Sequence, residues 1–254
     1  MKLAIMQPYF MPYIGYFQCI SAVDKYILYG NLTFIKDAWM NRNRILLKNG
    51  KIQTISVPLQ HKSSNTLINE ILIDNSQHWQ TKLLKTIYLN YKGSAFFEEM
   101  FPFFQSLLEK KYKYLFELNC ESIQKIVSLL SIDTIIDADN SRFSEMELLL
   151  NSVDEKYSDV IPYLTTNPIK KVARVIEMCR RENSNDFVNA IGGRELYNKD
   201  DFSVYGINLS FVKTENVFYN QFGNTFEPNL SIIDVLMHNG REGTQELLQK
   251  FTLI

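Results

Sequence analysis

The first thirty residues hold a strand, a loop, a helix and a second strand in direct succession, which strongly limits the folds open to this chain. The string KLAIMQP (residues 2–8) is short and apolar and ends in a proline, which is typical of a buried strand. Regular apolar spacing in IGYFQCISAV predicts a helix over 14–23, and DKYILYG predicts a strand over 24–30. Such a βαβ unit implies parallel strands and a right-handed crossover. We therefore expect an α/β, Rossmann-like fold with a mainly parallel sheet and flanking helices.

The remaining patterns add a hairpin and a group of helices to this sheet. Asn49-Gly50 lies between two alternating apolar runs, which predicts a β-hairpin over 42–59. Strands are expected over 68–74, 133–139, 186–193 and 207–213, and helices over 78–91, 94–108, 115–130, 168–183 and 231–238. Residues 143–164 read as helical and then irregular near Pro162. We expect one α/β domain over 1–254 with a helical insertion at 78–131.

Composition excludes some classes of partner. The formal net charge is -1, so no overall basic field favours nucleic acid or an anionic membrane. The apolar runs are too short to span a bilayer, and the N-terminus lacks a secretory apolar region. Three widely spaced cysteines, Cys19, Cys120 and Cys179, favour buried, reduced thiols and a cytoplasmic protein, with a catalytic cysteine as the alternative.

The segment MQPYFMPYIGYFQ follows the first strand, where an α/β sheet usually places its ligand site. Two prolines stiffen the backbone, a glycine permits close approach, and the tyrosines offer flat faces and hydroxyls to a sugar or a base. The alternative is an aromatic plug that closes the edge of the sheet. The candidate ligand-binding residues are Gln7, Tyr9, Tyr13, Gly15 and Tyr16.

The segment KDAWMNRNRI carries a second cluster. In an extended strand, Arg42 and Arg44 lie on the same face, where two guanidinium groups suit a phosphate, a diphosphate or a carboxylate. Asn41 and Asn43 then lie on the other face, where their amides can satisfy backbone groups, and both are also candidate substrate-binding residues. The alternative is a solvated edge strand, because edge strands often carry charge. Lys36 and Trp39 closely precede the pair and join the candidates.

The segment FEPNLSIIDVLMHNG combines helix-end signals with two candidate catalytic groups. Ser231 and Asp234 fit a helix N-cap, and Asn239-Gly240 fits a C-terminal stop. His238 lies in the last turn, where the helix dipole favours a cation. The alternative to this structural interpretation is proton transfer by His238 or Asp234.

Arg174 lies beside the apolar stripe of the helix over 168–183, so it is a further candidate for a ligand site. His61 and His78 have no partner at metal-ligand spacing, and we expect no metal site. The chain lacks the G-x-G-x-x-G, Walker A, G-x-S-x-G and H-E-x-x-H motifs, so the sequence leaves the identity of any cofactor unknown.

Several of these segments resemble the WbqC-like family. The matching strings are MQPYFMPYIGYFQ, VDKYILYGNLTFIK, WMNRNRILLKNGK with VPL, and SIIDVLMHNG, in order over nearly the whole chain. The resemblance implies a role in bacterial O-antigen or surface-polysaccharide biosynthesis. One departure is Gly30, which stands where an aspartate is expected after ILY. A weaker similarity in layout links PYIGYF to the H-x-G-H helix start of nucleotidylyltransferases, with Tyr13 and Tyr16 at the two histidine positions.

These features together predict a cytoplasmic transferase that acts on a nucleotide-activated or phosphorylated sugar in surface-polysaccharide assembly. Basic side chains would hold phosphate (Lys36, Arg42, Arg44), and tyrosines would stack on a base or sugar (Tyr9, Tyr13, Tyr16). The alternative is a non-catalytic protein that binds a sugar precursor or docks onto a polysaccharide-biosynthesis enzyme. A third hypothesis, a structural partner subunit, predicts an exposed apolar patch in place of a closed pocket.

Overall fold

A six-stranded sheet forms the centre of the protein. The computed structural model describes residues 1–36, 38–60, 66–223 and 225–254, so His61 lies outside the described residues. The strands run in the order β5-β2-β1-β6-β7-β8, all parallel except β8. Their bounds are β1 (Lys2–Met6), β2 (Lys25–Leu28), β5 (Ile135–Asp137), β6 (Asp186–Ala190), β7 (Asn208–Thr214) and β8 (Phe251–Leu253). The predicted mainly parallel α/β fold is confirmed.

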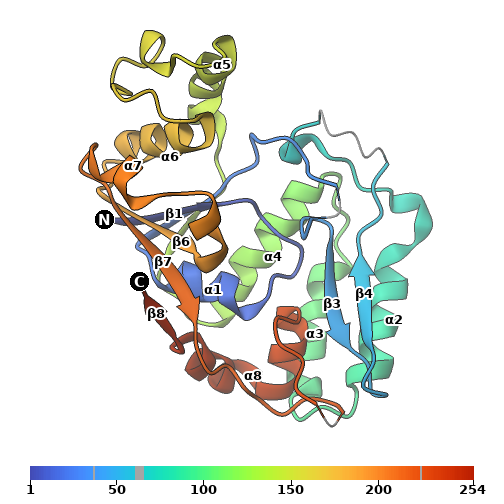
Figure 1. The fold of residues 1–254 in the computed structure, drawn as a ribbon. Helices are drawn as coiled ribbons and strands as arrows, with labels where there is room; N and C mark the ends of the chain where they lie inside the picture. Colours follow the sequence, from blue (N-terminus) through green and yellow to red (C-terminus); the bar gives the residue numbers. More distant parts are fainter. Residues whose placement is uncertain (37, 61–65, 224) are drawn as a thin grey trace.

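Helices cover both faces of this sheet, as Figure 1 shows. One face carries α1 (Ile14–Ser21), α4 (Leu115–Leu129) and α8 (Ile232–Leu248). The other carries α5 (Ser144–Ser152), α6 (Lys170–Arg181) and α7 (Lys199–Ser203). The result is a three-layer sandwich of the Rossmann-like type.

Successive residues of the central strands belong alternately to two apolar cores, one on each face of the sheet. In β1, Leu3 packs with the α5-α6-α7 layer, and the next residue, Ala4, packs with the α1-α4-α8 layer. The same alternation separates Phe187 from Val188 in β6. Successive side chains of a strand point to opposite faces, so a strand buried on both faces is apolar at nearly every position. This explains why these strands read as continuous apolar runs.

The predicted hairpin and the first two of the helices expected over 78–131 lie beside the sheet, whereas the third, α4, belongs to the layer on one of its faces. The hairpin pairs β3 (Arg42–Leu46) with β4 (Ile52–Ser56), and Gly50 in its loop has a φ of +76°. It lies alongside α2 (Trp79–Tyr91) and α3 (Phe97–Leu108), and α3 packs against α8 (Figure 1). The three helices α2, α3 and α4 occupy the expected region.

Three elements differ from the sequence-based expectation. The strand expected over 68–74 is wrong, because only a short 3-10 turn (Ile68–Glu70) and two isolated bridges, at Leu72 and Ile73, occur there. The alternating apolar residues of this loop bury Ile71 and Ile73 in the core without forming a ladder. The short elements β8 and α7 were not predicted.

The stop signal Asn239-Gly240 breaks α8 without ending it. Gly240 has a φ of +61° inside the helix, and helical turns resume after it. A Cβ atom at this position would lie 2.4 Å from the Phe96 ring. Glycine is therefore required here for both its backbone conformation and its lack of a side chain.

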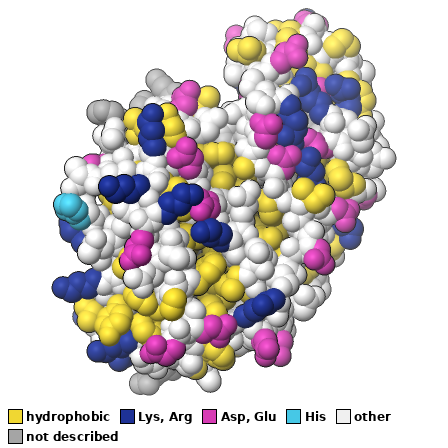
Figure 2. Space-filling view, turned by 180° about the vertical axis from the view of Figure 1, so that it is seen from behind, with side chains coloured by type: hydrophobic (Ala, Val, Ile, Leu, Met, Phe, Trp, Pro, Cys, Tyr) yellow, Lys and Arg dark blue, Asp and Glu magenta, His cyan; other side chains and the backbone are white. Residues whose placement is uncertain are grey.

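The surface carries charges of both signs. Figure 2 shows basic and acidic side chains interspersed over the face opposite to that of Figure 1, with apolar side chains between them. Within the part of the chain that the structure describes, none of the helices has the length and apolar character needed to cross a bilayer.

Candidate functional site

A cavity of about 620 Å³ opens at the carboxyl end of the parallel sheet. The last residues of three strands, Met6 of β1, Ala190 of β6 and Thr214 of β7, contribute to its wall. Its lining consists of Met6, Tyr9, Pro12, Tyr13, Trp39, Asn43, Arg44, Asn189, Ala190, Ile191, Gly192, Gly193, Leu196, Lys213, Thr214 and Asn229.

The position of this cavity follows from the winding of the sheet. From β1 the chain proceeds outward through β2 to β5 on one side, and through β6 to β7 on the other. The direction of winding therefore reverses between β1 and β6. In open α/β sheets, ligands bind in the crevice outside the carboxyl ends of the strands at such a switch point. We call this cavity the switch-point pocket.

One wall of the switch-point pocket is aromatic. Tyr9, Tyr13 and Trp39 line it, and the ring centroids of Tyr9 and the buried Tyr16 lie 5.6 Å apart. A Cβ atom on Gly15 would lie 2.4 Å from the Tyr13 ring, so this glycine leaves the room that the ring occupies. The segment chosen from sequence thus supplies part of the pocket wall.

Buried polar side chains hold this aromatic segment in place. The Asn43 amide donates to the backbone oxygens of Phe10 (3.0 Å) and Met11 (2.7 Å), and the Ser231 hydroxyl donates to Met11 (2.9 Å). Asn119 donates to the Pro8 oxygen at 2.9 Å. Met11 has a φ of +43°, which a residue other than glycine seldom adopts. These bonds fix a strained loop, which gives the pocket a preformed wall.

The two arginines of β3 point to one side of the strand, as predicted. The guanidinium carbons of Arg42 and Arg44 lie 5.8 Å and 5.7 Å from the centroid of the Trp39 ring. Asn41 and Asn43 bond to backbone instead, Asn41 to the Val57 oxygen at 3.0 Å. Only Arg44 of the two arginines lines the switch-point pocket.

Arg44 is the arginine of the pocket lining, and its guanidinium group is not fully satisfied. Its Nε atom is buried and has no hydrogen-bond partner among the described residues. A buried donor without a partner is costly, because it has lost its hydration without gaining a bond. An anionic ligand in the pocket would give the Arg44 guanidinium group an acceptor.

The opposite wall comes from residues that sequence reasoning did not select as candidates. Asn189, Gly192 and Gly193 lie at or after the end of β6, and Lys213 lies near the end of β7. Gly193 packs closely on Asn189, because a Cβ atom there would lie 2.6 Å from the Asn189 amide nitrogen. The signal for these residues was present, since the carboxyl ends of parallel strands must meet at one edge of the sheet.

Asp234 and His238 form a separate buried cluster. The Asp234 carboxylate accepts hydrogen bonds from Tyr91 (2.6 Å), Tyr219 (2.8 Å) and Gln221 (3.3 Å). Burial raises the pKa of Asp234, and these bonds and His238 only partly oppose the rise. Neither residue lines the switch-point pocket.

The residues of this cluster also make capping and packing contacts. The Ser231 hydroxyl caps α8 by accepting from the Ile233 amide at 3.3 Å, whereas the Asp234 side chain turns away to the tyrosines. His238 packs against Tyr91, Tyr219 and Phe222, and burial lowers its pKa despite the nearby Asp234. Its Nε2 atom is buried without a partner among the described residues.

Arg174 forms an ion pair within the layer of α5, α6 and α7. Its guanidinium group binds Glu147 in a bidentate way, at 2.5 Å and 2.9 Å, and the Tyr29 hydroxyl donates to the same carboxylate at 2.6 Å. Arg174 does not line the switch-point pocket.

The other candidate residues also lie outside the lining. The Tyr16 hydroxyl donates to the Gln7 backbone oxygen at 3.0 Å, so this bond stabilises the loop that follows β1. Lys36 is exposed and does not line the pocket. Gly30 packs against the Phe116 ring, because a Cβ atom there would lie 2.5 Å away, and its amide donates to Asn140. The space next to Gly30 excludes a side chain.

The three cysteines are free and buried. Burial raises the pKa of Cys19 and of Cys179 to about 12, and it raises the pKa of Cys120 as well. A thiol with such a pKa stays protonated near neutral pH and is a poor nucleophile. None of the three lines the switch-point pocket.

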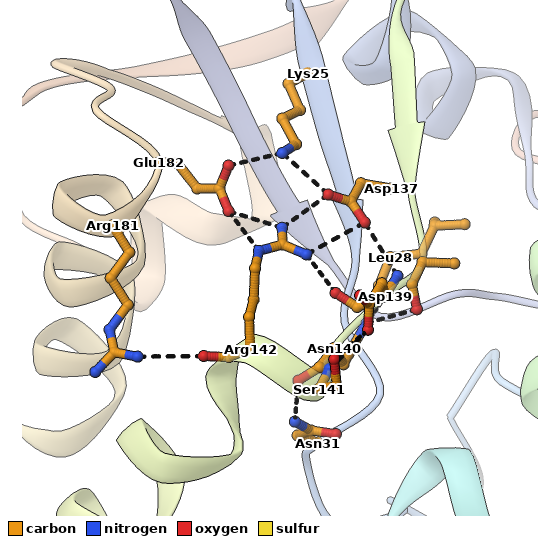
Figure 3. A network of polar contacts seen from close by, with 11 residues as sticks. Lys25, Leu28, Asn31, Asp137, Asp139, Asn140, Ser141, Arg142, Arg181 and Glu182 are labelled. Carbon is orange, nitrogen blue, oxygen red and sulfur yellow. Dashed lines mark hydrogen bonds and ion pairs between the residues drawn. The ribbon is translucent and has the colours of Figure 1, made fainter.

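Ion pairs at the β5 edge of the sheet form a closed network (Figure 3). Lys25 lies 3.0 Å from Asp137 and 2.7 Å from Glu182, and Arg142 lies 2.8 Å and 2.7 Å from the same two carboxylates. The network joins β2, β5 and the end of α6, so its charges serve the fold.

Comparison with known proteins identifies the family. The family model described as "WbqC-like protein family" matches residues 7–246. The chain belongs to this family. A protein of Mycobacterium tuberculosis (strain ATCC 25618 / H37Rv), "Uncharacterized protein Rv1507c", is 29% identical over 249 residues, which cover 97% of each chain. No solved structure matches the chain. The resemblance noted in the sequence is confirmed at the level of the family.

Proposed function

We propose that this WbqC-like protein binds a phosphorylated or nucleotide-activated sugar in the switch-point pocket, as a transferase of surface-polysaccharide assembly. The observation that carries the proposal is the position of Arg44, which lines the pocket together with an aromatic wall and whose buried Nε lacks a partner among the described residues. An anionic group attached to a ring system satisfies both features.

The charge of the lining favours an anion. Arg44 and Lys213 contribute positive charge, and the described lining contains no carboxylate. Lys213 lies 3.6 Å from Glu215 at the surface, an exposed pair that water screens strongly. An arginine fork suits a phosphate group because it donates two parallel hydrogen bonds. We assign the phosphate to the Arg44 side of the pocket.

The aromatic wall suits the ring portion of the ligand. Tyr9, Tyr13 and Trp39 present faces on which a sugar or a base stacks. Burial raises the pKa of Tyr9 and of Tyr13, so both hydroxyls stay protonated and can donate hydrogen bonds to sugar oxygens. The rigid loop lowers the entropic cost of binding, because its conformation is fixed before the ligand arrives.

A second function, binding without turnover, is favoured by one observation. Among the described residues that line the pocket there is no carboxylate, imidazole or thiol that would act as a general base. Asp234 and His238, the proton-transfer candidates from sequence, lie outside this lining. In this second function the protein holds a sugar precursor for another enzyme.

A ligand screen with a turnover assay tests both functions. Thermal shifts are measured with sugar phosphates, nucleotides and nucleotide-sugars for the wild type, Arg44→Gln and Lys51→Gln, the last an exposed hairpin lysine outside the pocket. We expect one phosphate-bearing class to raise the Tm of the wild type and Lys51→Gln but not of Arg44→Gln. No shift with any of these ligands would contradict the proposal.

Turnover then separates the two functions. The ligand identified by the screen is incubated with the protein and a mixture of sugar acceptors, and its products are followed by mass spectrometry. An acceptor that carries the transferred group, formed together with free nucleotide or phosphate at a rate above the protein-free control, supports the transferase. Tight binding with an unchanged ligand supports the second function.

A further inference from the structure

Three large apolar side chains of the switch-point pocket are exposed to solvent. Trp39 is 43% exposed, Ile191 37% and Leu196 50%. Trp39 belongs to the aromatic wall, whereas Ile191 and Leu196 belong to the opposite wall, after β6. Exposed apolar side chains thus come to the pocket lining from two separate segments, one before β3 and one after β6.

A sugar phosphate alone does not account for these side chains. A sugar is recognised by aromatic faces and hydrogen bonds, and the Tyr9, Tyr13 and Asn43 side of the pocket supplies both. Aliphatic groups such as Ile191 and Leu196 offer no hydrogen bonds, and their exposure to water is unfavourable. A ligand that is itself apolar at that point would remove them from water.

We propose that the ligand of the switch-point pocket is amphipathic: a phosphate or diphosphate ester held at Arg44, with an apolar chain that leaves the pocket between Trp39, Ile191 and Leu196. This inference rests on the proposed function, because it uses the same pocket and the same phosphate position. The proposed function names a sugar as one substituent of the phosphate, and this inference adds an apolar chain as the other.

The charge of the pocket separates this ligand from a neutral lipid or an apolar peptide. Arg44 and Lys213 line the same cavity as the exposed apolar residues, and no described carboxylate lines it with them. An uncharged apolar chain would cover Ile191 and Leu196 but leave the Arg44 Nε without an acceptor. A ligand that contacts both the basic and the exposed apolar residues of this cavity has an anionic head and an apolar tail on one molecule.

Alkyl phosphates of increasing length test the inference. Affinities of ethyl, butyl, hexyl and octyl phosphate are measured by calorimetry below their micelle concentrations. In the wild type we expect the affinity to rise by about two- to fourfold for each methylene group that becomes buried. Leu196→Ser should flatten this dependence on length, and Ile191→Thr should weaken it.

Two further variants separate the tail from the head. Leu148→Ser makes the same change at a leucine of α5 that is 72% exposed and lies outside the pocket, and it should keep the wild-type series. Arg44→Gln should weaken all four ligands by a similar factor and preserve their dependence on length. The melting temperature of each variant confirms that it is folded.

The outcomes distinguish this inference from the function on which it rests. Equal affinities for all chain lengths, still reduced by Arg44→Gln, would overturn the apolar tail and leave the phosphate site intact. Absence of any binding by the wild type would overturn both. A dependence on length that Leu196→Ser removes supports the inference.

A second experiment finds where the amphipathic ligand resides. Sedimentation is compared with phosphatidylcholine vesicles that contain or lack a long-chain alkyl phosphate. Arg44-dependent sedimentation with the phosphate-bearing vesicles supports a ligand held in a membrane. Absence of sedimentation, together with the length dependence in solution, supports a ligand that is taken up free.

Discussion

Arg44 and Arg174 were both candidates for anion binding, and the structure places them in opposite environments. Arg174 lies against Glu147, which it binds with two hydrogen bonds, and Tyr29 completes the group. Arg44 stacks on Trp39 and faces a cavity whose described lining contains no carboxylate. The first arginine is satisfied within the fold, whereas the second requires an acceptor from outside it.

This difference shows how a candidate ligand-binding arginine is distinguished from a structural one. A structural arginine has a carboxylate of the protein beside it, whereas a ligand-binding arginine does not. The β5 edge gives a second example, where Lys25 and Arg142 share Asp137 and Glu182 (Figure 3). Charges arranged in such closed pairs hold elements together. The comparison therefore predicts large stability effects at Arg174 and large binding effects at Arg44.

The largest expected effect on stability follows from removing the partner of Arg174. Glu147→Ala leaves the Arg174 guanidinium and the Tyr29 hydroxyl without their acceptor in a mostly buried place. We expect a loss of about 3–5 kcal/mol in the free energy of unfolding, measured by urea denaturation. The exposed Glu145→Ala on the same helix should change it by less than about 0.5 kcal/mol. Similar losses in the two variants would contradict the structural role of the pair.

A smaller effect is expected where α8 meets the aromatic segment. The Ser231 hydroxyl caps α8 and also donates to the Met11 oxygen. Ser231→Ala should cost about 1–2 kcal/mol of stability and weaken ligand binding, because Met11 belongs to the strained loop that carries the pocket wall. The exposed Ser203→Ala serves as the control. A loss of stability without any change in binding would separate the cap from the pocket.

The Asp234–His238 cluster predicts a modest dependence of stability on pH. Burial lowers the pKa of His238 below its usual 6.5, so the unfolded chain binds more protons as the pH falls below that value. Stability contributed by neutral His238 is therefore lost on acidification. Asp234, whose pKa burial raises, acts with the opposite sign, because its folded form takes up a proton more readily.

Comparing wild type with His238→Phe isolates the histidine. Between pH 7 and about pH 5, we expect the wild-type Tm to fall relative to the variant by about 1–3 °C. Scanning calorimetry at several pH values measures this difference. Parallel Tm profiles would show that His238 does not titrate differently in the folded and unfolded states.

The smallest expected effect on stability is at Arg44 itself. Arg44→Gln removes a guanidinium group whose Nε is buried without a described partner, so the free energy of unfolding of the ligand-free protein should change by less than about 0.5 kcal/mol. Urea denaturation beside Glu147→Ala completes the comparison of the two arginines. A loss as large as that of Glu147→Ala would mean that Arg44 serves the fold.

The sequence predicted the sheet and the hairpin because these depend on local patterns. Apolar runs indicate strands, and Asn49-Gly50 indicates a turn, even when the strands that pair with them are not known. The prediction of a strand over 68–74 was wrong, because alternating apolar residues indicate burial and not strand pairing. These residues are buried there without forming a ladder of β-sheet hydrogen bonds. Nothing local distinguishes these two outcomes.

The candidate site was predictable only on one side. The aromatic segment and β3 carry distinctive residues, and Tyr9, Tyr13, Trp39, Asn43 and Arg44 line the pocket as a result. Asn189, Gly192 and Lys213 are ordinary residues whose importance comes from the strand order, which places β6 and β7 beside β1. The ion pair of Arg174 was not foreseen, because its partner, Glu147, lies in a different element, 27 residues away.

The most direct test of the central claim measures how much of the binding energy depends on the phosphate and on Arg44. Calorimetry compares the best phosphorylated ligand with its dephosphorylated form, for the wild type, Arg44→Gln and Lys51→Gln. We expect Arg44→Gln to weaken the phosphorylated ligand about 10- to 100-fold and to leave the dephosphorylated form unchanged, with Lys51→Gln behaving as wild type. Equal affinity of wild type and Arg44→Gln for the phosphorylated ligand would contradict the assignment of Arg44 as its anion-binding residue.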